Sequence, residues 1–191
     1  MMSRKGDDMR KGVLLAVLLG LGLALFGAAA QDVSPADQQF FDSRIGSLVK
    51  LEPHRIDSPA LSKVFSSTFY EVGVDVAGAT TKLLVARNGE NIVEVTEPST
   101  TAEMPDFEKI FNPSFRLTDS EQAHVLQDAL DILFPIDTTF DTEDLAAKAI
   151  RHSGTEWTFI RGKFFEHFKG MVFTTNQSGA VRRVDFSLEI K

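Results

Sequence analysis

Residues 157–191, WTFIRGKFFEHFKGMVFTTNQSGAVRRVDFSLEIK, decide the fold, because with Glu156 they predict three consecutive β-strands. The last strand is the clearest, since apolar and polar residues alternate along it with a period of two, which gives one oily and one polar face. Its two faces are Val184, Phe186, Leu188 and Ile190, and Arg183, Asp185, Ser187 and Glu189. We therefore expect an antiparallel sheet whose apolar face is buried.

The turn between the last two strands sets the expected register. Residues 176–179, Asn-Gln-Ser-Gly, are typical of a turn. A loop of two or four residues would place Phe173 opposite Arg182 and Met171 opposite Val184. The face that such a register buries consists of Met171, Phe173, Val184 and Phe186.

The N-terminal half begins with a predicted helix. Ser34 is a suitable N-cap and Pro35 a suitable first helical residue, and Pro53 is expected to end the helix. Its apolar stripe contains Phe40, Phe41, Ile45, Leu48 and Val49. Residues 54–62 have no periodicity, which predicts a loop.

Three strands are expected next. Residues 64–76 predict a long strand, with Tyr70, Val72, Val74 and Val76 on one face. Residues 81–87 and 92–96 predict a hairpin, because the intervening Asn88-Gly89 favours a turn with positive φ. Residues 106–111 predict one helical turn, which buries Phe107, Ile110 and Phe111.

Two further helices are expected before the terminal sheet. Thr118-Asp119-Ser120-Glu121 forms a capping box, and Pro135 is expected to end the helix that it opens. The buried face of this helix is Ala123, Leu126, Ala129, Leu130 and Leu133. A second helix is predicted from Asp141 or Thr142 to a stop at Ser153-Gly154. Its inward residues are Leu145, Ala146, Ala149 and Ile150.

Together these elements predict an α+β fold, in which antiparallel meanders of about six strands pack against three to four helices. We expect one domain over residues 31–191, with two halves of similar α-βββ plan over 34–97 and 118–190. This tandem layout resembles that of small exported inhibitors and PepSY-like modules. The alternative is one curved sheet wrapped around the helices, similar to the NTF2-like or cystatin-like cone.

The first thirty residues predict an export signal. Four basic residues precede an apolar run over 12–26, and Ala28, Ala29 and Ala30 offer a cleavage site before Gln31. The alternative is an uncleaved membrane anchor made by residues 12–30. We expect a periplasmic or secreted protein, and with no cysteine in the chain its fold cannot depend on disulfides.

The charge of the remaining chain restricts its partners. The first thirty residues contain four of the 20 basic and two of the 27 acidic residues, so residues 31–191 have a formal charge of −9. Nucleic acids and anionic membrane surfaces require a basic face, so we expect neither as a partner, except for membrane contact through an uncleaved leader. The 16 phenylalanines, against one tyrosine and one tryptophan, predict a phenylalanine-rich interior.

The strongest candidate binding surface is the first terminal strand. If no bulge interrupts it, Trp157, Phe159, Arg161 and Lys163 share one face, where rings and cations can hold an acidic or planar ligand. The alternative is that Trp157 and Phe159 belong to the core and that the stem of Arg161 is packed. Gly162 and Gly170 favour a bulge or bend in this region.

Metal and catalytic sites are less well supported. Glu121, His124 and Asp128 share a helix face, but the partner ligands that a bundle metal site needs are missing. The acidic residues 137–144 suit helix starts better than a calcium loop. His152 and His167 each have a carboxylate nearby in the sequence, Glu156 and Glu166, without an accompanying nucleophile motif. We expect no metal and no cofactor.

These observations favour an exported, non-enzymatic binding protein that uses the face or edge of its C-terminal sheet. Its partner is expected to be a protein or small molecule of the cell envelope. Two alternatives remain: an NTF2-like or cystatin-like cavity for a small apolar ligand, and a hydrolase that pairs a histidine with a carboxylate.

Overall fold

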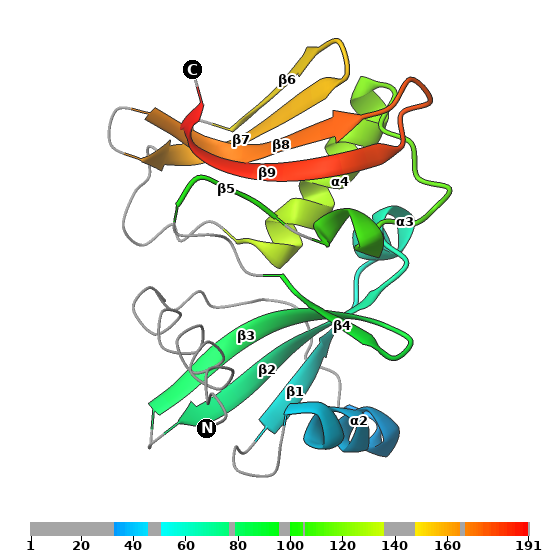
Figure 1. The fold of residues 1–191 in the computed structure, drawn as a ribbon, viewed down its shortest axis with the longest axis vertical. Coiled ribbons are helices and arrows are strands. Elements are labelled where there is room, and N and C mark those ends of the chain that lie inside the picture. The colour runs from blue at the N-terminus through cyan, green and yellow to red at the C-terminus, as the bar shows by residue number, and fades with distance from the viewer. Residues whose placement is uncertain are drawn as a thin grey trace, which may run out of the picture.

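The terminal stretch forms the centre of an antiparallel sheet in the computed structural model (Figure 1). The structure describes residues 33–45, 51–76, 79–95, 100–104, 106–135, 148–164 and 167–190. The leader therefore lies outside the described residues. The described helices are α2 (Pro35–Ile45), α3 (Pro59–Val64), the 3-10 helix η1 (Phe107–Ile110) and α4 (Ser120–Leu133). The described strands are β1 (Leu51–Ile56), β2 (Thr68–Val76), β3 (Ala79–Asn88), β4 (Asn91–Glu94), β5 (Ala102–Glu103), β6 (Ala149–Ser153), β7 (Glu156–Phe164), β8 (His167–Thr175) and β9 (Val181–Ile190).

The C-terminal sheet has the order β5-β9-β8-β7-β6, and it confirms the three strands expected from residues 156–190. The expected register is wrong by two residues, since Phe173 pairs with Val184 and Met171 with Phe186. The loop is longer than expected: Thr175 pairs with Val181, and Asn176 holds the turn by accepting from the backbone N–H groups of Ser178 and Ala180. A shift of two keeps every side chain on its own face. The expected buried face is therefore confirmed.

Helix α4 covers this apolar face, as its periodicity predicts. Ala123, Leu126, Ala129, Leu130 and Leu133 are all buried in the core cluster that contains Phe173 and Phe186. The helix begins one residue later than expected, because Asp119 rather than Thr118 is the N-cap and accepts from Gln122 N at 2.9 Å. Asp119 is the stronger cap because its carboxylate also interacts with the helix dipole.

Strand β6 contradicts part of the second predicted helix. Ala149 and Ile150 belong to this strand, and residues 141–147 lie outside the described residues. Gly154, with φ of +61°, belongs to a tight β6–β7 turn in which Ser153 pairs with Glu156. A glycine that terminates a helix and a glycine in a hairpin both require positive φ, so this residue alone does not distinguish the two.

The N-terminal sheet has the order β1-β2-β3-β4 and confirms the expected meander as β2, β3 and β4. The predicted start of its first strand at Val64 is wrong, because Val64 ends α3 and β2 begins at Thr68. Gly89, with φ of +61°, makes the β3–β4 turn between the paired Asn88 and Asn91. Strand β1 and helix α3 replace the loop predicted over 54–62. Pro53 lies within β1 instead of ending a helix, because β1 is an edge strand and an edge tolerates a missing N–H.

Helix α2 covers the outer face of this sheet. Phe40 and Phe41 pack against Tyr70, Val72 and Val85, which confirms the shared face of Tyr70 and Val72. The expected continuation of the helix stripe, Leu48 and Val49, lies outside the described residues.

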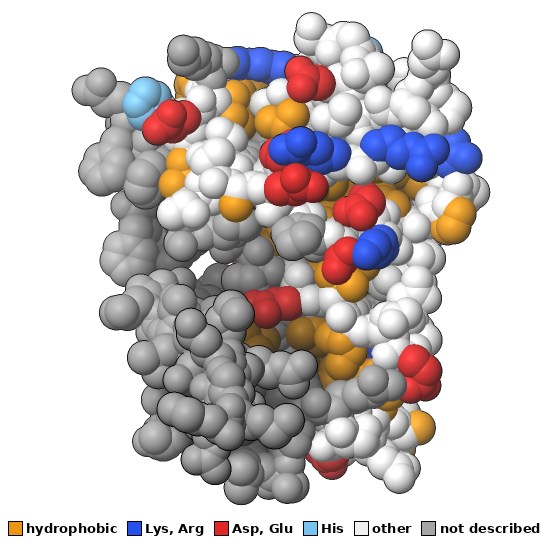
Figure 2. Space-filling view, viewed as in Figure 1, with side chains coloured by type: hydrophobic (Ala, Val, Ile, Leu, Met, Phe, Trp, Pro, Cys, Tyr) orange, Lys and Arg blue, Asp and Glu red, His pale blue; other side chains and the backbone are white. Residues whose placement is uncertain are grey.

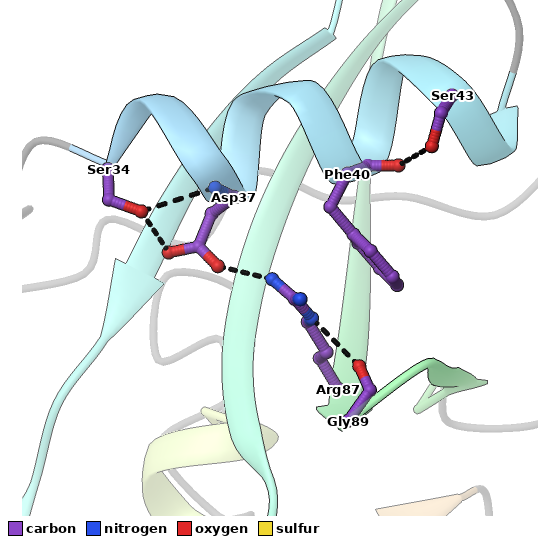
Figure 3. A network of polar contacts seen from close by, with 6 residues as sticks. All are labelled: Ser34, Asp37, Phe40, Ser43, Arg87 and Gly89. Atoms are coloured by element: carbon purple, nitrogen blue, oxygen red, sulfur yellow. Dashed lines mark hydrogen bonds and ion pairs between the residues drawn. The ribbon is translucent and has the colours of Figure 1, made fainter.

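A polar network fixes α2 on the sheet (Figure 3). Ser34 and the guanidinium of Arg87 both hold the carboxylate of Asp37, and Arg87 lies 3.7 Å from the ring centroid of Phe40. Burial and the nearby charge of Asp37 raise the pKa of Tyr70.

One aromatic core joins the two sheets. Helices α3, η1 and α4 lie between them (Figure 1), and Phe65, Phe69 and Ala86 belong to the same buried cluster as Phe159 and Phe173. The backbones also meet at a β-bridge between Phe65 and Phe111. The expected burial of Phe107, Ile110 and Phe111 is confirmed, and the layers run α2, first sheet, helices, second sheet.

Candidate functional site

The candidate site is an open groove between α4 and the β6–β7 hairpin. Its volume is about 600 Å³. Helix α4 and the two residues before it contribute Thr118, Asp119, Ser120, Ala123, His124 and Gln127 to its lining. The groove exists because α4 covers the centre of the sheet, whereas β6 is the outermost strand on that side.

The helix wall presents the polar first two turns of α4. The backbone N–H of Gln122 donates to Asp119 and holds the pKa of this carboxyl below its usual value. The Nδ1 atom of His124 lies 2.6 Å from the carbonyl oxygen of Ser120. A carbonyl oxygen only accepts, so Nδ1 is the protonated nitrogen of this ring and its Nε2 can accept from a ligand when the ring is neutral.

The opposite wall is lined by Lys148, Ala149, Ile150, His152 and Trp157. His152 and Trp157 are cross-strand partners, and their rings stack with centroids 3.8 Å apart. The Nε2 atom of His152 donates to the carbonyl oxygen of Gly154 at 2.9 Å, which orients the ring on the indole. Trp157 is 5% exposed, so the stacked rings form an aromatic floor in which the indole is almost completely covered.

A charged clamp connects the two walls behind the groove. Asp131, on the last turns of α4, accepts from Lys148 Nζ at 2.8 Å and from Arg161 Nη1 at 3.2 Å. Arg161 also donates to the carbonyl oxygen of Phe134, one of the last carbonyls of the helix. The clamp therefore sets the position of α4 relative to β6 and β7, and with it the width of the groove.

The residues predicted from the sequence as a binding stripe do not form an exposed surface. Trp157, Phe159 and Arg161 are 5%, 0% and 3% exposed. The pairing shifts between Ile160 and Gly162, so a bulge interrupts the strand at Arg161. The expectation of one accessible ring-and-cation stripe is therefore wrong for these three residues. The backbone of Lys163 lies in β7, and its side chain lies outside what the structure describes.

Strands β7 and β8 approach each other closely beside the bulge. A Cβ atom on Gly170 would lie 2.0 Å from the carbonyl oxygen of Phe159. The sequence hypothesis of an irregularity between Gly162 and Gly170 is confirmed by the shift in β8–β9 pairing between Phe168 and Gly170, whereas the bulge at Arg161 lies just before Gly162. The bulge re-aims Arg161 toward the end of α4.

The sheet surface on the β9 side is of mixed charge. Figure 2 shows basic side chains beside acidic ones in the half of the view that contains β9 in Figure 1. Arg183, for example, lies near both Asp185 and Glu103. Such interspersed charges are typical of a solvated surface. The groove is therefore the better candidate for a binding site.

Metal chemistry finds no support in the described ranges. Within them, no group of three or more potential ligand side chains lies close enough together to hold a metal ion. Glu121, His124 and Asp128 are exposed positions on α4. The acidic residues 137–144 lie outside the described residues.

The described helices also lack the combination of length and apolar character that spanning a bilayer requires. Comparison of the chain with protein families, with curated proteins and with solved structures gives no match.

Sequence reasoning missed most of the groove. His124 and His152 are 28 positions apart in the chain, so the sequence suggests separate roles for them, as a metal ligand and as a catalytic base. One signal was present: a two-residue turn at Gly154-Thr155 makes His152 and Trp157 cross-strand neighbours. No local pattern shows that α4 lies beside β6, since that contact is tertiary.

Proposed function

We propose that this protein is an exported binding protein whose partner occupies the groove between α4 and β6. The supporting observation is the groove itself, at the edge of the C-terminal sheet. Ligand sites are concave, have volumes of about 300–1,000 Å³ and combine an apolar floor with a few placed polar groups. The His152–Trp157 stack is such a floor, and the rims carry polar groups from both elements.

The arrangement favours binding over the other two functions. The polar contacts of His124 and His152 are with backbone carbonyl oxygens, whereas a histidine base in a hydrolase is held by a carboxylate and faces a nucleophile. A cavity for an apolar ligand would be lined by phenylalanine, but none of the described residues that line this groove is a phenylalanine. The buried phenylalanines pack against one another instead.

Partner capture tests this proposal. The purified protein is cross-linked in an envelope extract of its source cells, and captured molecules are identified by mass spectrometry. Gln127 lines the groove and Asp128 is an exposed neighbour that does not. We expect Gln127→Phe to fill the groove and remove the partner, and Asp128→Phe to retain it. A partner that survives Gln127→Phe in a folded variant contradicts the proposal.

Export is tested separately by cell fractionation and N-terminal sequencing. We expect the protein outside the cytoplasm, with a mature chain that begins at Gln31. An intact leader in the membrane fraction would support the anchored alternative, and a cytoplasmic location would contradict export altogether.

A further inference from the structure

We propose that the occupant of the groove is an extended peptide segment of a partner protein, which adds to β6 as a further strand and places an acidic residue opposite Arg151. This inference rests on the proposed binding function and specifies its partner. Strand addition takes its affinity from main-chain hydrogen bonds and its specificity from alternate side chains.

The outer side of β6 has the backbone groups that strand addition needs. In the described part of the chain, β6 is the last strand of its sheet, and only β7 pairs with it. Hydrogen-bonded and non-hydrogen-bonded residue pairs alternate along β6 and β7, starting at the two-residue turn with the hydrogen-bonded pair Ser153–Glu156. Ile150 and His152 belong to the non-hydrogen-bonded pairs. The N–H and C=O groups of Ile150 and His152 therefore point away from β7, toward the place of an added strand.

The other described sheet edges are less suitable for strand addition. Pro53 interrupts β1, and β4 has only 4 residues. Strand β9 is covered by residues 101–104, because Met104 N donates to the carbonyl of Val184 and Leu188 N to the hydroxyl of Thr101. Natural edges are commonly protected by proline, shortness or cover. Among the described edges, β6 combines the greatest length with no proline.

The side chains of β6 define which residues the added strand presents. Ile150 and His152 face the groove, so Arg151 lies on the opposite face of the sheet, where its guanidinium is 5.8 Å from the ring centroid of Phe168. In an added strand, the residue opposite Arg151 is in a non-hydrogen-bonded pair, in which side chains come closest. A carboxylate there is attracted to the guanidinium and a cation is repelled.

Charge also argues against a second copy of this chain as the occupant. Two β6 strands related by a two-fold axis pair all their residues in a single register, centred on Arg151. That register places Arg151 directly opposite Arg151 of the copy. Like charges in directly opposite positions destabilise a strand pair. A foreign acidic strand fits the same edge without this repulsion.

The first test uses a peptide series. The probes are acetylated, amidated heptapeptides Thr-Val-Thr-X-Thr-Val-Thr with X as Glu, Gln or Lys. Trp157 is the single tryptophan of the chain and lines the groove, so its emission reports occupancy. We expect saturable binding that is about fivefold tighter for Glu than for Lys. Arg151→Glu should reverse this order, and an unchanged order would overturn the assignment of Arg151.

The second test removes backbone donors. Ile150→Pro deletes an outward N–H at an edge, a change that β1 already contains at Pro53. We expect peptide binding at least about tenfold weaker, with Ile150→Ala as the side-chain control. N-methylated peptides test the same point without any change in the protein. Methylation of the alternate residues whose N–H groups point toward β6 should abolish binding, and methylation of the other alternate residues should not. Equal binding of the two sets of methylated peptides would overturn strand addition.

The outcomes separate this inference from the function on which it rests. If Gln127→Phe removes the natural partner but Ile150→Pro and N-methylation have no effect, the groove binds its partner in another way and strand addition is wrong. The same holds if no peptide changes the emission of Trp157. If the protein forms a dimer that Ile150→Pro dissociates, the occupant is a second copy. If the natural partner still binds the folded Gln127→Phe variant, both proposals are overturned.

Discussion

His152 lies flat on Trp157 across the β6–β7 hairpin, with 3.8 Å between the ring centroids and 12° between the ring planes. The two residues are directly opposite one another in the strand pairing. The stack shields the indole on the groove side. Trp157 is therefore only 5% exposed, although the neighbouring strand β6 lies at the edge of the sheet. The ring of His152 is thus part of the floor of the proposed binding site.

Removing this ring should open the floor of the groove. We expect His152→Ala to shift the emission of Trp157 to longer wavelength, because water reaches the indole. We also expect a loss of about 1 kcal/mol in the free energy of unfolding, typical of an aromatic pair. Fluorescence and urea denaturation measure both effects. His167→Ala, on the exposed start of β8, is the control, and an unshifted emission in His152→Ala would contradict the stack.

Gly170 should tolerate no other residue. A Cβ atom there meets the backbone of Phe159 rather than a movable side chain, so β7 and β8 must separate. We expect Gly170→Ala to lower the free energy of unfolding by about 3 kcal/mol. Gly154→Ala has open space and only its positive φ to oppose it, so its cost should be about 1 kcal/mol. Equal costs in denaturation would show that the close approach is absent.

Arg161 should contribute to stability rather than to direct binding. Replacement by alanine leaves the carbonyl of Phe134 without this donor and removes one partner of Asp131. We expect Arg161→Ala to cost about 3 kcal/mol, because the lost hydrogen bonds are charge-assisted and the site is buried. Lys82→Ala removes an exposed ion pair with Glu71 and should cost less than about 1 kcal/mol. Similar melting of the two variants would contradict the clamp.

Tyr70 should titrate above its usual value of about 10. Burial and Asp37 favour the neutral phenol, so the folded state retains a proton that the unfolded state loses. Stability must therefore fall as the pH rises above the ordinary tyrosine range toward the raised pKa. Tyr70 is the only tyrosine, so ultraviolet absorbance reports it alone. We expect Asp37→Asn to lower the titration midpoint and Glu71→Gln, on the opposite face of the sheet, to leave it unchanged.

The elements that follow from local pattern were predictable from the sequence. Helix α4 has a cap and a continuous apolar stripe, and β9 alternates along its whole length, so local preference and burial agree in both. Helix α3 was missed although Ser58-Pro59 repeats the start signal of Ser34-Pro35. Its 6 residues are too few for a helical period to be recognised.

The remaining differences come from tertiary position. Pro53 ends a helix in most local contexts, and only its place on an edge strand makes it compatible with β1. Trp157 and Arg161 looked like a surface because an uninterrupted strand would align them. The bulge at Arg161 lies beside the close approach of Phe159 to Gly170, a residue on another strand, and no local pattern shows that approach. The groove likewise depends on the neighbouring positions of α4 and β6.

The aromatic cluster between the sheets makes the two halves of the chain depend on each other for folding. Phe65 from the first half contacts Phe107 and Phe111 from the connecting segment, and Phe111 contacts Phe173 of the second sheet. Neither half can keep its rings of this cluster out of water without the other. A chain cut between the halves should yield two fragments that aggregate when alone and refold only when mixed, and the intact protein should melt in a single calorimetric transition.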